Sequence, residues 1–264
     1  GHGAILDLVE APPYLIALTE DGLLSFTYTD TLPQPVGFSP GGGQALAVER
    51  SLALLAARQA GLRVYSLASD GSLAWLASLP LPGEALDVAF SPDGKSAYVA
   101  AGEAGLLRVD LSDPAHPLLS GVISSIAPVE SVAVMGDRLL AGSDGRVWAL
   151  DPHAADPLLG VYAPLRDGRR IVIAGEYAYI ADAAEGLKIL WLSDPQAPLQ
   201  TFGEIGHPAS AVRVEGDTLY LAGADGVRLF DVSNRFQPAE TARIDLPGQP
   251  QALALAGDRL FVAL

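Results

Sequence analysis

The sequence contains no cysteine among its 264 residues, which excludes a disulfide framework and thiolate chemistry. It has no apolar run near the roughly 18 residues that a membrane-spanning helix needs. Its longest apolar run, residues 52–57, has the length of one strand. No segment of about ten residues shows helical spacing of its apolar positions. These absences predict an all-β protein without membrane insertion.

Basic residues are also scarce: 16 Lys and Arg stand against 31 Asp and Glu, and the formal net charge is −15. Nucleic acids and anionic lipids are bound by basic surfaces, so this balance argues against both as partners. The charge favours a protein whose copies repel one another and stay dispersed. It permits a cationic partner without requiring one.

What the sequence does contain is a repeat of about 40 residues that is anchored on a glycine. The clearest copies are Gly105-Leu-Leu-Arg-Val-Asp-Leu-Ser-Asp-Pro and Gly186-Leu-Lys-Ile-Leu-Trp-Leu-Ser-Asp-Pro. The other copies begin at Gly22, Gly61, Gly145 and Gly226. A period of this length indicates an array, a solenoid or a propeller.

Each period holds short runs rich in Val, Leu, Ile and Tyr that are bounded by Gly, Pro and Asp, as strands and turns are. In the last full copy, strands are expected at residues 210–214, 218–222, 227–232 and 240–245. The dipeptide Asp225-Gly226 predicts a type I′ turn between the second and third of these. Four antiparallel strands per period indicate a β-propeller blade, which is stable only when neighbouring blades bury its two apolar faces.

We therefore expect a single all-β propeller domain over residues 1–264, with six full repeats and a C-terminal half-repeat at 251–264. The full blades are expected at residues 4–38, 44–79, 84–123, 130–162, 169–204 and 210–245. Because the half-repeat supplies only two strands, the propeller has either seven blades or six. The two missing strands could come from a longer natural chain or from another chain, or the hairpin is surplus to six blades. An unpaired strand edge is a site where a partner can add a strand.

The string Gly-Leu-x-Val-x-Asp-Leu-Ser-Asp-Pro, followed by a second Pro and a Gly, resembles the LVIVD-repeat propellers. The second Pro and the Gly are Pro117 and Gly121 in one copy, and Pro198 and Gly203 in another. The resemblance covers nearly the whole chain and is clearest over residues 84–264. It implies the propeller fold. Because members of this family are often surface-located, it also implies an extracellular or cell-surface position, but it implies no particular activity.

The motifs that could indicate catalysis or metal binding are better explained as loops and turns of a propeller. Gly37-Phe-Ser-Pro-Gly41 matches the nucleophile elbow of hydrolases, but that elbow needs a following helix, and here a loop and another strand follow. His116 and His153 are expected on the opposite side of the blades from His207, so a three-histidine metal site is not expected. We predict no catalytic residue, no metal and no cofactor.

Two sets of residues are candidates for ligand binding. The first strands should line a channel mouth of mixed charge, where Glu84, Glu130 and Arg169 supply polar groups. The one non-periodic feature is the loop at 165–170. Its arginines suit carboxylate or phosphate recognition, or pair with nearby acids on a solvated loop. The predicted binding face consists of Arg166, Arg169, Arg170, Tyr162 and His207.

The sequence thus predicts a non-enzymatic scaffold for protein or ligand binding that is exported or lies at the cell surface. Two alternatives stay open. One is a subunit of a larger assembly or filament, joined through the open C-terminal half-blade. The other is an enzyme or small-ligand binder that uses the channel mouth. A protein partner or self-assembly is expected, and nucleic acid is not.

Overall fold

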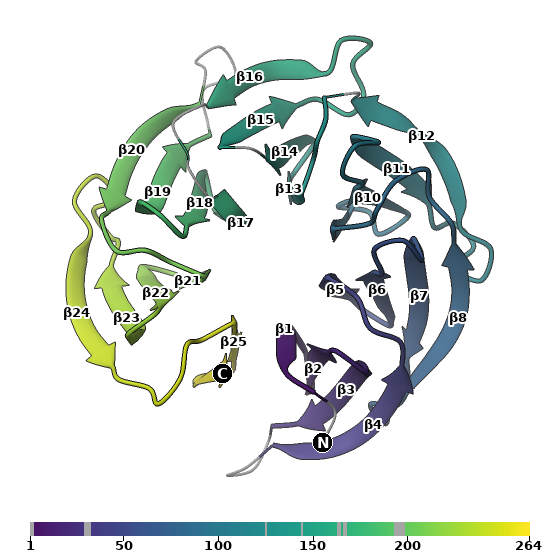
Figure 1. Ribbon diagram of the computed structural model, residues 1–264, viewed down its shortest axis with the longest axis horizontal. Coiled ribbons are helices and arrows are strands. Elements are labelled where there is room, and N and C mark those ends of the chain that lie inside the picture. The colour runs from purple at the N-terminus through teal and green to yellow at the C-terminus, as the bar shows by residue number, and fades with distance from the viewer. Residues whose placement is uncertain are drawn as a thin grey trace. The chain divides into compact units, whose positions relative to one another are not determined.

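The computed structural model describes residues 3–28, 33–124, 126–143, 145–162, 165, 168–192 and 199–264, without the side chains of residues 124, 168, 169 and 200. In these residues all regular structure is β, and the strands form six four-stranded antiparallel sheets and one two-stranded sheet (Figure 1). This confirms the predicted β-propeller of four-stranded blades. The described residues hold no helix of the length and apolarity that crossing a membrane requires.

One compact unit comprises residues 1–129 and 254–263. It contains three blades, in each of which the strands pair in sequence order. Blade one is β1 (Ile5–Ala11), β2 (Tyr14–Thr19), β3 (Gly22–Thr27) and β4 (Gln34–Pro40). Blade two is β5 (Ala45–Glu49), β6 (Leu52–Ala56), β7 (Leu62–Leu67) and β8 (Leu73–Leu79). Blade three is β9 (Asp87–Phe90), β10 (Ser96–Ala100), β11 (Leu106–Asp110) and β12 (Leu118–Ser124).

The second compact unit comprises residues 130–253 and 264, and it contains the other three blades. Blade four is β13 (Ser131–Met135), β14 (Arg138–Ser143), β15 (Arg146–Leu150) and β16 (Leu158–Tyr162). Blade five is β17 (Gly168–Ala174), β18 (Tyr177–Asp182), β19 (Gly186–Trp191) and β20 (Gln200–Ile205). Blade six is β21 (Ala211–Glu215), β22 (Thr218–Gly223), β23 (Gly226–Asp231) and β24 (Ala239–Ile244).

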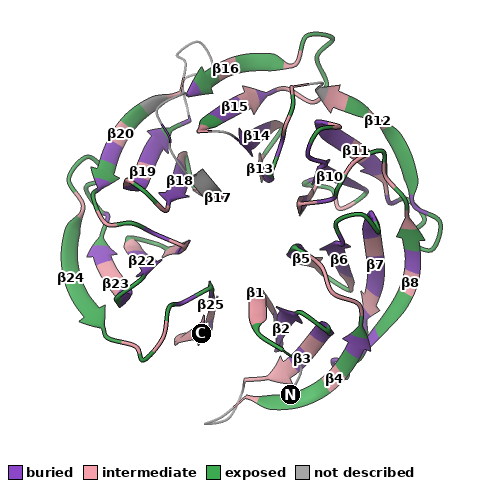
Figure 2. Ribbon diagram, viewed as in Figure 1, coloured by how far each residue is buried: buried purple, intermediate pink, exposed green. Residues whose placement is uncertain are grey.

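Burial within a blade follows strand order (Figure 2). Every residue of the second strands β2 and β10 is buried, because these strands are covered on both faces and read as nearly continuous apolar runs. Every residue of the fourth strand β24 is exposed. The apolar core therefore lies between sheets at their inner strands, and the fourth strands carry the surface.

Apolar side chains that pack between successive blades form the core of each unit. Leu18, Leu55 and Tyr65 belong to the cluster between blades one and two. Ile189 and Leu221 belong to the cluster between blades five and six. Full burial of one such aliphatic side chain contributes about 1.5–3 kcal/mol relative to its exposure. A blade without a neighbour would lose this contribution on one face.

The anchoring glycines precede or begin the third strands. Gly61, Gly186 and Gly226 have φ of 76°, 103° and 115°, a region that side-chain-bearing residues rarely adopt. A Cβ at any of them would also collide with a fourth-strand carbonyl oxygen. Both the backbone conformation and the lack of space for a Cβ require glycine at these positions. This requirement explains why the repeat is visible in the sequence as regularly spaced glycines.

The predicted type I′ turn at Asp225-Gly226 is wrong. Gly223 pairs with Gly226, so Ala224 and Asp225 are the central residues of the turn. A type I′ turn needs positive φ at both, and the only described non-glycine residues with positive φ are Arg50 and Arg58. The positive φ of Gly226 serves the close approach to the fourth strand instead.

A β-bulge interrupts the pairing of the third and fourth strands in each of the six described blades. In blades three and six the bulged residues are Ser120 and Thr241. Their hydroxyls donate to the opposite carbonyl oxygens of Arg108 and Leu229 at 3.1 and 3.2 Å. A bulge bends and twists its strand, so the outer edge of a blade is a poor template for a further strand.

The predicted half-repeat is a two-stranded sheet of β25 (Ala252–Ala256) and β26 (Arg259–Ala263). Residues 254–263 belong to the same unit as blade one. Arg259 Nη1 donates to the carbonyl oxygen of Tyr28 at 3.0 Å, and the rings of Tyr28 and Phe261 lie 5.9 Å apart. Burial and the hydrogen bond that Tyr28 donates to Glu10 raise the pKa of Tyr28 to about 12, so the hydroxyl stays neutral.

Candidate functional site

The structure describes only part of the predicted binding face. Arg166 and the side chain of Arg169 lie outside the described residues, and Arg170 is half-buried on β17. Tyr162 is buried at the end of β16, and its hydroxyl shares a 2.5 Å hydrogen bond with Thr201 Oγ1. The hydroxyl of Tyr162 is therefore engaged within its own unit, and whether the arginine loop binds an anion stays a prediction.

The two glutamates expected at the channel mouth are both exposed. Glu84 accepts a hydrogen bond from Gln59 Nε2 at 3.2 Å, and Glu130 precedes β13. They belong to different units of the chain, so a shared mouth stays a prediction. Within the described part of the chain, no group of three or more His, Asp or Glu side chains could hold a metal ion.

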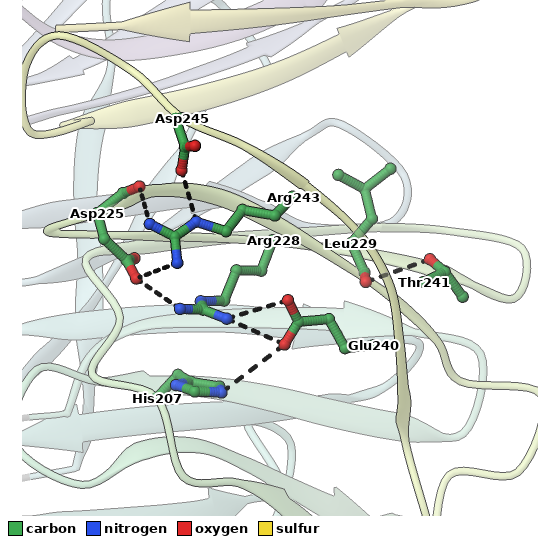
Figure 3. A network of polar contacts seen from close by, with 8 residues as sticks. All are labelled: His207, Asp225, Arg228, Leu229, Glu240, Thr241, Arg243 and Asp245. Atoms are coloured by element: carbon green, nitrogen blue, oxygen red, sulfur yellow. Dashed lines mark hydrogen bonds and ion pairs between the residues drawn. The ribbon is translucent and has the colours of Figure 1, made fainter.

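His207 lies in a network of charged side chains on blade six (Figure 3). Its centre is Arg228 on β23, whose guanidinium lies 2.5 Å from Asp225 Oδ2 and 3.0 Å from both carboxylate oxygens of Glu240. His207 Nε2 lies 3.9 Å from Glu240 Oε2. The predicted histidine thus contacts Glu240 on β24, and the same carboxylate contacts Arg228 on β23.

A second arginine completes this network. Arg243 Nε lies 2.6 Å from Asp245, and its Nη1 lies 3.4 Å from Asp225 Oδ2 (Figure 3). The hydrogen bond with Arg228 lowers the pKa of Asp225 and raises the pKa of Arg228. Each of the three carboxylates contacts at least one of the two arginines, so the network acts as a structural ion-pair cluster.

The fourth strands carry most of the exposed apolar surface. Ten of the thirteen large apolar side chains that are exposed in the described residues lie on these strands. Six of the ten lie on residues 118–122 of β12 and 158–161 of β16, which we name the outer apolar segments. Their members are Leu118, Leu119, Val122, Leu158, Leu159 and Val161.

The exposure of these side chains is large: Leu118 is 64% exposed and Val122 is 58% exposed. Single exposed apolar residues are normal on any surface, but runs of them mark places where another molecule binds. The bulges in β12 and β16 make main-chain pairing with a further strand unfavourable. A partner would therefore contact the side chains of these strands rather than their edges.

The outer apolar segments were not predicted from the sequence. Both follow a proline: Pro117-Leu-Leu in blade three and Pro157-Leu-Leu in blade four. The same position reads Pro198-Leu-Gln in blade five and Pro238-Ala-Glu in blade six. The second leucine, at a position where blades five and six have Gln and Glu, was the available signal, and it was hidden among many apolar residues of the repeat.

A family model described as the LVIVD repeat matches residues 82–124 and 166–202. The first stretch contains blade three, and the second begins just before β17 and ends within β20. The predicted resemblance is thus confirmed in two copies of the repeat. No curated protein matches the sequence.

Several solved structures share the fold. U3-55K is 15% identical with a TM-score of 0.79, over 99% of this chain and 88% of that one. The β-propeller domain of Cps50 (Swd1) from Myceliophteria thermophila is 13% identical with a TM-score of 0.78, over 95% and 89%. A putative 6-phosphogluconolactonase from Bacteroides fragilis is 12% identical with a TM-score of 0.77, over 97% and 86%. At these identities the likeness concerns the fold alone.

Proposed function

We propose that this chain, a β-propeller with LVIVD repeats, is a non-enzymatic scaffold that binds a protein partner through its outer apolar segments. The observation that carries the proposal is a run of three exposed Leu and Val side chains on one fourth strand of each unit, β12 in the first and β16 in the second. A soluble chain exposes such a run where a partner covers it for at least part of the time.

The partner we expect has an apolar centre with a basic rim. Burial of one exposed leucine contributes about 1.5–3 kcal/mol, so a few of these side chains suffice for a stable contact. The net charge of −15 surrounds them with a negative potential, which favours a partner of opposite charge and accelerates its association. The acidic surface also disfavours pairing of two copies through the same segments.

The test is a binding comparison between purified wild type and the double variant Leu118→Ser/Val122→Ser. Proteins captured on the immobilised chain from the cells it comes from would be purified and titrated individually. We expect a saturable complex whose Kd rises at least ten-fold in the double variant and rises with salt concentration, because both contact types are weakened.

The matched control is Ala242→Ser on β24, an exposed fourth strand that lacks an apolar run. It should change the Kd by less than two-fold. If every purified partner binds the double variant as tightly as wild type, the outer apolar segment of β12 is not the binding surface. The same substitutions in β16, Leu158→Ser and Val161→Ser, then decide whether the proposal survives for blade four.

A second candidate function is assembly through β26. In the described residues this strand pairs only with β25, and its contacts with Tyr28 hold it in place. A pre-positioned strand with one unpaired edge can accept a strand from a second copy. Light scattering of the purified chain should then show a mass that rises with concentration. Val262→Lys should abolish the rise and Ile244→Lys on the bulged strand β24 should not, whereas a constant monomer mass would rule this candidate out.

A further inference from the structure

We propose that a groove on blade two binds a carboxylate that carries an apolar group. The groove lies between β7, β8 and the end of β4, and its volume is about 400 Å³. Its lining residues are Pro40, Gly41, Arg63, Tyr65, Trp75 and Ser78. The one charge among them is the cation of Arg63. This site is independent of the outer apolar segments and of the protein partner proposed for them.

Arg63 occupies the same position in the repeat as Lys188 and Arg228, two residues after the anchoring glycine. In blades five and six, carboxylates of the same blade neutralise this cation. Lys188 Nζ lies 3.0 Å from Glu204 and 3.8 Å from Glu185, and Arg228 is paired as described above. In blade two, no carboxylate of the described residues forms an ion pair with Arg63.

The acidic positions that neutralise the cation are substituted in blade two. Ala60 stands directly before the anchoring glycine, where blade six has Asp225. Ser78 lies directly opposite Arg63 on the neighbouring strand, at the position where blade five has Glu204 opposite Lys188. Blade two thus shares a cation with blades five and six and lacks the carboxylates that neutralise it there.

Two further residues that line the groove of blade two replace polar side chains of blade six. Trp75, which is 60% exposed, takes the cross-strand position of Glu240. Gly41 takes the position of His207: each lies two residues after the fourth-strand residue, Ser39 or Ile205, that pairs with the first residue after the preceding blade's anchoring glycine. A Cβ on Gly41 would clash with Arg63 Nη1 and lie 3.0 Å from Tyr65 Oη. Blade six fills this space with its own polar side chains, and blade two leaves it open.

Tyr65 contributes a second polar group, beside the guanidinium of Arg63. It lies two residues after Arg63 on β7 and is 0% exposed, and apart from Arg63 its buried hydroxyl has no hydrogen-bond partner among the described residues. Burial raises the pKa of this hydroxyl and the nearby Arg63 draws it down, so it remains a proton donor at neutral pH. The equivalent residue of blade six is Phe230, which needs no partner.

A carboxylate satisfies both groups. The planar guanidinium of Arg63 can hold two carboxylate oxygens, and the hydroxyl of Tyr65 can donate a further hydrogen bond. The exposed ring of Trp75 offers an apolar surface for the rest of the ligand. The strongly negative chain favours a monoanion over a phosphate dianion. Two sources supply this chemistry: a free aromatic carboxylic acid and the C-terminal residue of a peptide.

The experiment is calorimetric titration of the full chain with 3-phenylpropionate and with N-acetyl-alanyl-phenylalanine. The controls are the corresponding amides and inorganic phosphate. We expect one site per chain, with each amide bound at least 30-fold more weakly than its acid. Binding of the peptide acid alone identifies a peptide terminus as the ligand. Similar affinity for both acids, or binding of the free acid alone, identifies a small carboxylic acid.

Three variants separate a binding role from a structural one. Arg63→Gln should weaken binding at least 30-fold, and Arg146→Gln, at an exposed position of blade four, should leave it unchanged. Tyr65→Phe should weaken binding about five-fold without lowering the melting temperature, since its hydroxyl has no described partner to lose. The proposal is overturned if neither acid binds better than its amide, if phosphate binds as tightly, or if Arg63→Gln binds normally.

Discussion

Arg63 in blade two and Arg228 in blade six share a repeat position but differ in their surroundings. Arg228 contacts Asp225 and Glu240 at 2.5 and 3.0 Å, whereas Arg63 lines an open groove beside an unpaired hydroxyl. The backbone is the same in both blades, with a glycine of positive φ and a bulged fourth strand. Polar pairing at this position is therefore not needed for the fold, and it is free to vary between copies.

The largest expected effect on stability comes from exchanging Tyr65 and Phe230, the aromatic residues two positions after Arg63 and Arg228. Phe230→Tyr places a hydroxyl in a buried position of blade six and should lower the free energy of unfolding by about 2 kcal/mol. Tyr65→Phe removes a buried hydroxyl whose proton has no acceptor among the described residues, and it should raise the free energy of unfolding by about 1 kcal/mol. Urea unfolding of both variants measures the two changes. A loss of stability in Tyr65→Phe would show that the hydroxyl has a structural partner.

Removal of each cation should give the next largest effect. Arg228→Gln leaves Asp225 and Glu240 without their cation, and we expect it to lower the free energy of unfolding by about 1 kcal/mol, because both carboxylates are partly exposed and screened. Arg63→Gln breaks no ion pair among the described residues and should change stability by less than about 0.5 kcal/mol. Equal losses in the two variants would contradict the distinction between a filled and an open site.

The pH dependence of stability should give the smallest effect. Arg228 lowers the pKa of Asp225, so the stabilisation is present above the unfolded-state value of about 3.9 and is lost as pH falls through the lower folded-state pKa. The carboxylate is 44% exposed, so we expect about 0.5 kcal/mol between wild type and Asp225→Asn at pH 6, declining towards zero below pH about 3. The difference between wild type and Arg63→Gln should stay constant over this range.

The features of the fold that could be predicted are those with a local cause. The anchoring glycines Gly61, Gly186 and Gly226 each combine positive φ with close approach to a fourth-strand carbonyl oxygen, so this position of the repeat requires glycine. Short apolar runs bounded by Gly, Pro and Asp predicted four strands per period, and the structure has them. The turn at Ala224-Asp225 could not be predicted, because the positive φ of Gly226 arises from a neighbouring strand rather than from the turn.

The candidate sites were less predictable. The loop with Arg166, Arg169 and Arg170 attracted attention because it breaks the period, whereas Arg63 is concealed within it. Alignment of blade two with blades five and six would have revealed Ala60 where they have Glu185 and Asp225, and Ser78 where blade five has Glu204. Sequence comparison could not have shown that the hydroxyl of Tyr65 is buried without a partner.

The sequence by itself determined the fold class, the repeat of four strands and the net negative charge, because period, strand pattern and charge are properties of composition and order. Only the tertiary structure decided which cations are neutralised and which face an open groove. Those partners come from other strands and from the preceding blade, so their distances depend on packing. Gly41 shows the reason most directly: its missing side chain matters only because β4 ends beside Arg63 and Tyr65.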